Sequence, residues 1–136
     1  MRRAAAAGVV VTTALTLGAC GTPSPDLFVV NRDGTVPGAR LTLLVSDTSA
    51  RCNGADPEPL TSAQTLEARD LADELLKVQR GEVKVPPAPP AQIFRFAVRT
   101  EEGTLRFGDG AQRPEVLPRL VRFARRVAID VCGLER

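Results

Sequence analysis

The sequence predicts an α+β fold with the element order β-β-α-β-β-α: a small antiparallel sheet, two helices packed on one face and one disulfide. Three segments alternate apolar and polar residues with period two, the pattern of half-buried strands, and a short apolar run precedes the first of them. Two longer segments repeat apolar residues at helical spacing. One sheet covered on a single face by both helices buries all of these apolar positions together.

The first hairpin is predicted over residues 27–47. Residues 27–32 form a short apolar run, and residues 39–47 alternate leucine and valine with mostly polar side chains. The connecting residues 33–38, DGTVPG, contain Asp-Gly and Pro-Gly, which are turn signals. Residues 48–60 contain a glycine and two prolines and are predicted to be a loop.

The first helix is predicted over residues 62–80. Thr61 and Gln64 have the spacing of a capping box, in which each side chain bonds the other's backbone N–H. Gly81 favours the left-handed residue that commonly ends a helix. The apolar stripe consists of Leu66, Ala68, Leu71, Ala72, Leu75 and Val78.

The second half repeats the pattern after a proline-rich segment. Residues 82–91 hold four prolines, which exclude a helix and predict a rigid extended crossing. Phe94 and Phe96 begin an alternation that resumes at Leu105 and Phe107, which predicts a second hairpin.

The last helix begins near Pro114 or Val116, because Pro118 is tolerated only within the first helical turn. We expect its arginines to form a solvated outer face, with anionic lipid headgroups as the alternative partner. These arginines are Arg119, Arg122, Arg125 and Arg126.

The first twenty residues have the pattern of an export signal. A basic start, Met1–Arg3, precedes the uncharged residues 4–17, a run too short to span a membrane but of the length of a signal core. Leu17-Gly18-Ala19-Cys20 then resembles the lipobox of bacterial lipoproteins. The resemblance implies cleavage between Ala19 and Cys20, a diacylglycerol thioether on Cys20, and a further acyl chain such as palmitate on its amino group.

This interpretation divides the chain into a signal peptide (1–19), a flexible tether (20–26) and a single α+β domain (27–136). Without Arg2 and Arg3 the chain has 16 basic and 16 acidic residues, so its balance of charge does not indicate nucleic acid. The expected location is the cell membrane, with the domain lipid-anchored on the extracytoplasmic side. The membrane is then one partner, and a second, protein partner is unknown.

Lipidation of Cys20 leaves Cys52 and Cys132. In an oxidising compartment an even pair most simply forms one disulfide. Two free thiols are the alternative, and a metal held by this pair alone is a weaker one.

Catalytic chemistry is poorly represented. The chain has no histidine, which excludes Ser-His-Asp triads, Cys-His pairs and histidine-ligated metals. Two carboxylate groupings, Asp70 with Asp73 or Glu74 and the pair Glu101-Glu102, are predicted on a helix surface and in a hairpin turn, where solvated charges are the simpler interpretation. We therefore expect no enzyme, no metal and no cofactor beyond the acyl groups on Cys20.

One loop carries a second resemblance. Arg32, Gly34 and Gly38 match the loop Arg-x-Gly-Gly-aromatic-small-Gly, while Thr35 stands where a second glycine is usual and Val36 where an aromatic is usual. With Phe94-Arg95-Phe96 and Val98 in a later strand, residues 28–127 resemble the emfourin-type inhibitors of protealysin-like metallopeptidases. The resemblance implies a partner-binding loop at Arg32, Gly34, Thr35, Val36 and Gly38.

Two functions are therefore expected. The first is a non-enzymatic binding or structural module of the cell envelope, held by its lipid anchor. The alternative is an inhibitor of secreted thermolysin-like metallopeptidases that presents the loop at residues 32–38.

Overall fold

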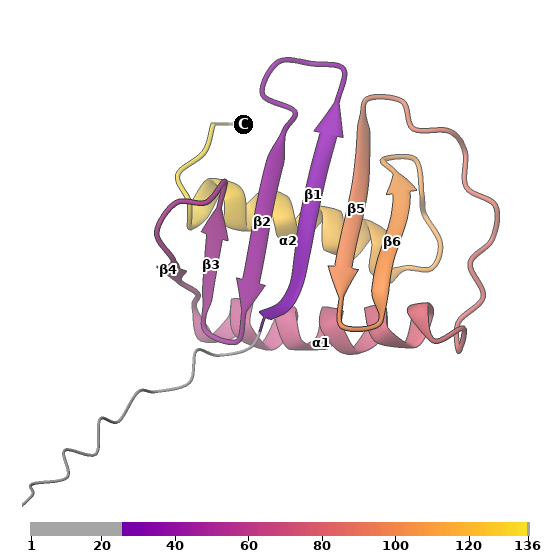
Figure 1. Ribbon diagram of the computed structural model, residues 1–136, viewed down its shortest axis with the longest axis horizontal. Helices are drawn as coiled ribbons and strands as arrows, with labels where there is room; N and C mark the ends of the chain where they lie inside the picture. Colours follow the sequence, from indigo (N-terminus) through magenta and orange to yellow (C-terminus); the bar gives the residue numbers. More distant parts are fainter. Residues whose placement is uncertain (1–25, 136) are drawn as a thin grey trace, which may run out of the picture.

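The computed structural model describes residues 26–135 and forms a six-stranded antiparallel sheet with two helices (Figure 1). The elements are β1 (Asp26–Gly34), β2 (Leu41–Ser46), β3 (Ser49–Cys52), β4 (Glu58–Pro59), α1 (Ser62–Gln79), β5 (Phe94–Thr100), β6 (Gly103–Gly108) and α2 (Val116–Asp130). The strand order is β4-β3-β2-β1-β5-β6, and Figure 1 shows both helices behind the same face of the sheet. The predicted α+β fold is confirmed.

Strand β1 lies in the interior of the sheet and pairs with β2 on one side and β5 on the other. Phe28 and Val30 point to the helices and are buried, whereas Asn31 and Asp33 lie on the opposite face and are exposed. The same alternation continues across β2 and β5. The sheet therefore has one face in the core and one face that no helix within residues 26–135 covers.

The core is one continuous cluster between the sheet and the helices. At its centre the rings of Phe28 from β1 and Phe123 from α2 meet edge to face, with centroids 6.2 Å apart. The other fully buried large side chains are Leu43, Leu71, Leu75, Leu117, Leu120, Val30, Val45, Val98, Val116 and Val127.

Helix α1 begins as its sequence predicts. The Gln64 backbone N–H donates to the Thr61 hydroxyl at 3.2 Å, and the Thr61 N–H donates to the Gln64 side chain at 2.9 Å. Gly81 follows the helix with a φ of +76°. The predicted apolar stripe is wrong at Leu66, which is 65 % exposed because its turn precedes Ala68, the first buried position of the helix.

The predicted loop over residues 48–60 is wrong in part, because it contains β3 and β4. Strand β3 pairs with β2 through Cys52 opposite Leu43, and the sheet therefore extends past the first hairpin. The glycine and prolines that indicate a loop fall after β3. Pro59 ends the two-residue edge strand β4, where a residue without an N–H is tolerated.

The predicted disulfide is confirmed. Cys52 is the last residue of β3, and Cys132 follows α2. The two residues are 80 positions apart in the sequence, and their Cα atoms lie 6.2 Å apart. The bond ties one side of the sheet to the end of the last helix. In the chain-entropy account, a bridge that closes a loop this long restricts the unfolded chain strongly.

We expect Cys52→Ala/Cys132→Ala to lower the free energy of unfolding by about 2–5 kcal/mol. Urea denaturation of the oxidised proteins measures the difference. The same comparison under full reduction is the control, and the two proteins should then unfold at nearly the same urea concentration. An unchanged midpoint in the oxidised state would contradict the stabilising role.

Candidate binding surface

The uncovered face of the sheet, here called the open face, consists of the outward side chains of five strands. Their register places them in three rows across the sheet. The first row is Arg51, Leu44, Val29, Arg99 and Thr104. The second is Thr42, Asn31, Ala97 and Arg106. The third holds Asp33, Arg95 and the backbone of Gly108. Arg40, which precedes β2, lies beside Asp33, as does Arg95.

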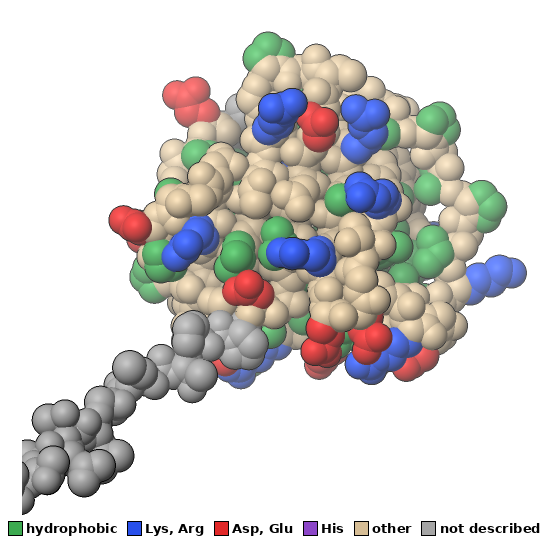
Figure 2. Space-filling model, in the orientation of Figure 1, with side chains coloured by type: hydrophobic (Ala, Val, Ile, Leu, Met, Phe, Trp, Pro, Cys, Tyr) green, Lys and Arg blue, Asp and Glu red, His purple; other side chains and the backbone are tan. Residues whose placement is uncertain are grey.

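Five arginines lie on the open face and give it a basic character: Arg40, Arg51, Arg95, Arg99 and Arg106. All five are exposed. Figure 2, which views the molecule from this side, shows blue side chains spread across the sheet with few red ones between them. The acidic residues of this face are Asp33, in the third row, and Asp26, at the start of β1.

The arginines of the open face are only loosely paired. Asp33 lies 3.9 Å from Arg40 and 4.0 Å from Arg95, at the limit of an ion pair and between exposed groups. Arg51, Arg99 and Arg106 form no ion pair with any residue that the structure describes.

The helix layer pairs its charges more closely. Arg119 of α2 donates to Asp70 at 2.6 Å and to Glu74 at 2.5 Å, both on α1. The hydrogen bond from Arg119 lowers the pKa of the Asp70 carboxyl. Arg126 bonds Glu67 at 2.5 Å.

The expected solvated outer face of the last helix is therefore wrong for Arg119, which is half-buried between the helices. Arg126 also bonds α1 but is exposed. Arg122 and Arg125 are exposed. The carboxylate groupings noted in the sequence also contain residues that form ion pairs. Arg119 bonds Asp70 and Glu74, and Arg80 bonds Glu102 at 2.9 Å.

Two shallow hollows lie on the open face, on either side of Asn31 and Asp33. The first is bounded by Arg95 and Arg106 and by Ala91 of the proline-rich crossing. The second is bounded by Arg40 and by residues of β2.

Asp109 holds the end of the crossing in place. Its carboxylate accepts the backbone N–H of Gln92 at 2.8 Å, of Ile93 at 2.9 Å and of Phe94 at 3.0 Å. These hydrogen bonds, with that from Phe94 the largest cause, lower the pKa of the Asp109 carboxyl. Gly108 leaves room for the crossing, because a Cβ there would lie 2.7 Å from Ala91.

The loop between β1 and β2 combines structural residues with an exposed tip. Arg32 donates from Nε to the Ala39 carbonyl at 2.8 Å and from Nη2 to the Gly38 carbonyl at 3.3 Å. Its guanidinium carbon lies 5.0 Å from the centroid of the Phe94 ring. Partial burial, together with the nearby charge of Arg125, lowers the pKa of Arg32. Arg32 thus stabilises the conformation of the loop through these contacts.

The glycines of this loop also have structural causes. A Cβ on Gly34 would lie 2.6 Å from the Ile93 carbonyl oxygen, and Gly38 has a φ of +73°. What the loop presents to solvent is residues 35–38, all exposed, with Val36 as their largest apolar side chain. Of the predicted loop residues, Thr35 and Val36 are therefore the ones whose side chains are exposed to solvent.

Ala19 and Cys20, the predicted cleavage and acylation residues, lie outside the described residues. Within residues 26–135, no group of three or more histidine, cysteine or acidic side chains is placed to hold a metal ion. No helix in that part of the chain has the length and apolar character needed to cross a membrane.

The open face is the feature that the sequence patterns do not reveal. Arg95 and Arg99 alternate with the core residues of β5, which places them on the outer face. Relating them to Arg40 and Arg51 requires the strand order, because β5 joins β1 rather than a strand adjacent in sequence.

Comparison with protein-family models gave no match, and searches of curated proteins and of solved structures gave none that is significant. The resemblances to lipoproteins and to emfourin-type inhibitors stay predictions.

The lowered pKa of Asp109 predicts an acid-dependent contribution to stability. A carboxyl whose pKa is lower in the folded than in the unfolded state stabilises the fold above about pH 3.9 and ceases to do so as the pH falls through the folded pKa. We expect Asp109→Asn to unfold several degrees below the parent protein at neutral pH, with the gap closing in acid. Thermal unfolding followed by circular dichroism over a pH series measures this.

The matched control for Asp109 is Asp73→Asn, which removes an exposed carboxylate that bonds no other described residue. Its unfolding temperature should follow that of the parent protein throughout. A difference in unfolding temperature between Asp109→Asn and the parent protein that is equally large at every pH would contradict the stabilising role of the charged Asp109 carboxylate.

Proposed function

We propose that this chain is an exported bacterial lipoprotein, acylated at Cys20, whose domain is a non-enzymatic binding module of the cell envelope. The lipobox at Leu17–Cys20 supports the anchor. The observation that carries the binding role is the open face, where five arginines lie on a sheet surface that no helix covers. These arginines contribute little to the stability of the fold, because their ion pairs are long or lacking among the described residues. Their concentration on one surface therefore suggests that they bind a ligand.

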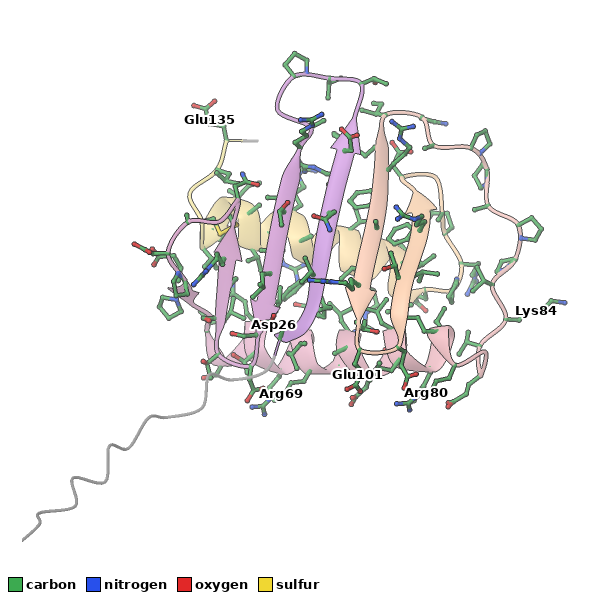
Figure 3. All side chains as sticks on the ribbon, viewed as in Figure 1. Asp26, Arg69, Arg80, Lys84, Glu101 and Glu135 are labelled. Atoms are coloured by element: carbon green, nitrogen blue, oxygen red, sulfur yellow. A yellow bond between two sulfur atoms is a disulfide. The ribbon has the colours of Figure 1, made fainter. Side chains whose placement is uncertain are left out.

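The start of β1 is suitably placed for an anchor. Asp26 follows Cys20 by six residues, a span of at most about 20 Å when fully extended. Figure 3 shows Asp26 at the same end of the sheet as Glu101 in the β5–β6 turn. The loop at residues 35–38 lies at the other end of β1, about 30 Å away along a nine-residue strand.

A non-enzymatic role is supported by how the acidic residues are used. Asp70, Glu74 and Glu102 are bonded to arginines and lie at the surface. The hydrogen bond from Arg119 lowers the pKa of the Asp70 carboxyl, whereas a general acid at neutral pH needs a raised pKa.

We expect the full chain, expressed in a bacterial host supplied with labelled palmitate, to incorporate label and to sediment with membranes. Cys20→Ser should abolish the label, because the thiol that receives the lipid is gone, and release the protein from membranes washed at about 1 M salt, where attraction between charges is screened. Cys52→Ser/Cys132→Ser is the matched control and should keep the label. A labelled Cys20→Ser protein, or an unlabelled parent, would disprove the anchor.

A second function, inhibition of a thermolysin-like metallopeptidase, is favoured by the geometry of the loop. Its tip at residues 35–38 is exposed at the end of the sheet far from the start of β1 (Figure 1). Arg32 holds the carbonyls of Gly38 and Ala39, so the loop is pre-organised. A pre-organised loop loses less conformational entropy when a protease binds it.

For this second function, we expect the chain from residue 20 to inhibit thermolysin, and Val36→Asp to raise the inhibition constant at least about tenfold, the loss of one good contact. Arg32→Ala should also weaken inhibition, because it frees the loop. Val85→Asp is the control, since Val85 is 44 % exposed against 42 % for Val36 and lies in the proline-rich crossing. Equal effects of the two valine changes, or a parent protein without inhibition, would exclude this function.

A further inference from the structure

We propose that the open face, through Arg40, Arg51, Arg95, Arg99 and Arg106, binds the anionic surface of a lipid bilayer. The binding is electrostatic and belongs to the folded domain itself, separate from any acyl chain. The inference rests on the proposed function for one point, which is the cellular compartment where the domain meets such a membrane surface.

The first support is the separation of charge over the molecule. From Cys20 onward, basic and acidic residues are equal at 16 each. Arg69, Arg80, Arg119 and Arg126 of the helix layer bond carboxylates at 2.5–2.9 Å. On the open face, five arginines accompany only Asp33 and Asp26. A near-neutral chain thus carries five exposed arginines and only two acidic residues on one broad surface, which attracts anions.

The second support is the spread of these arginines in two dimensions. Arg51 and Arg99 are three strand spacings apart in one row, about 14 Å. Arg95 and Arg99 are four residues apart along β5, about 13 Å. Side chains dispersed in this way do not converge on a single phosphate. They suit an extended sheet of anionic headgroups that each guanidinium meets separately.

The third support is the absence of aromatic side chains from this face. Phe28, Phe96 and Phe123 are buried, and Phe94 and Phe107 belong to the core side of their strands. Single-stranded nucleic acids are usually held by aromatic side chains on which the bases stack, together with basic residues. The basic residues of the open face lack that platform, which favours a ligand recognised by charge alone.

The apolar centre of the face is too small to insert into a bilayer. Val29 is only 6 % exposed, and Leu44 and Ala97 are half-buried. Attraction to headgroups must then supply the affinity. A basic side chain near an anionic membrane strengthens binding about fivefold, so several together give a measurable, salt-sensitive affinity.

Residues 20–136 carrying Cys20→Ser provide the test protein, since every described strand, helix and core residue lies within them. Sedimentation with vesicles measures the partition coefficient. The vesicles are phosphatidylcholine alone, or phosphatidylcholine with about one third phosphatidylglycerol, at about 0.1 M salt. We expect binding to the anionic vesicles only, and its loss at about 1 M salt, where charges are screened.

The decisive comparison is between two triple variants of equal charge. Arg95→Glu/Arg99→Glu/Arg106→Glu should lower the partition coefficient by at least about a hundredfold. Arg113→Glu/Arg122→Glu/Arg125→Glu changes three exposed arginines outside the open face and should remain within about fivefold of the parent. Arg95→Gln/Arg99→Gln/Arg106→Gln provides the same test without introducing acidic groups, should the glutamate variant not fold.

Several results would overturn the proposal. They are no binding to anionic vesicles at low salt, equal binding to neutral vesicles, or equal losses in the two triple variants. Binding of a polyglutamate peptide or a single-stranded oligonucleotide that vesicles fail to displace would assign the face to a soluble polyanion instead. Labelling of Cys20 is measured separately, so failure of the vesicle test leaves the anchor standing, and the reverse also holds.

Discussion

The structure depends on the pairing of β1 with both β2 and β5, which places an alternating strand at the centre of the sheet. Phe28 and Val30 then anchor the core, where Phe28 meets Phe123 of α2. The intervening residues necessarily point away, and no helix among the described residues covers them because both helices lie on the other side. The buried core and the open face are therefore two results of one alternation.

The fold could be predicted from sequence to the extent that burial imposes periodicity. An apolar run identifies β1, alternation identifies β2, β5 and β6, and the helical stripes with the Thr61 capping box identify α1 and α2. The sequence does not predict strand β3, because Ser-Ala-Arg-Cys has few strand formers and gains its conformation from pairing with β2. The sequence does not reveal that the arginines of the open face form one group. Outward positions carry no periodic constraint, and these arginines come together only through the strand order.

Arginine has two different uses in this molecule. Between the helices, Arg119 spans from α2 to Asp70 and Glu74 of α1, and its planar guanidinium suits two carboxylates at once. Below the first loop, Arg32 holds backbone carbonyls. On the open face, Arg51, Arg99 and Arg106 have no such partner among the described residues. Pairing thus distinguishes arginines that stabilise the fold from those available to a ligand.

The pairing of β1 with β5 also constrains how the chain acquires its structure. Val29 pairs with Arg99, and Cys52 bonds Cys132, so the first strand depends on residues synthesised much later. A chain threaded through a membrane from its amino end would present β1 with one unpaired edge until the second hairpin emerged. Non-local pairing of this kind slows folding, and an unpaired apolar strand invites aggregation. On the proposed export, such a chain is best held unfolded until its last helix has crossed the membrane.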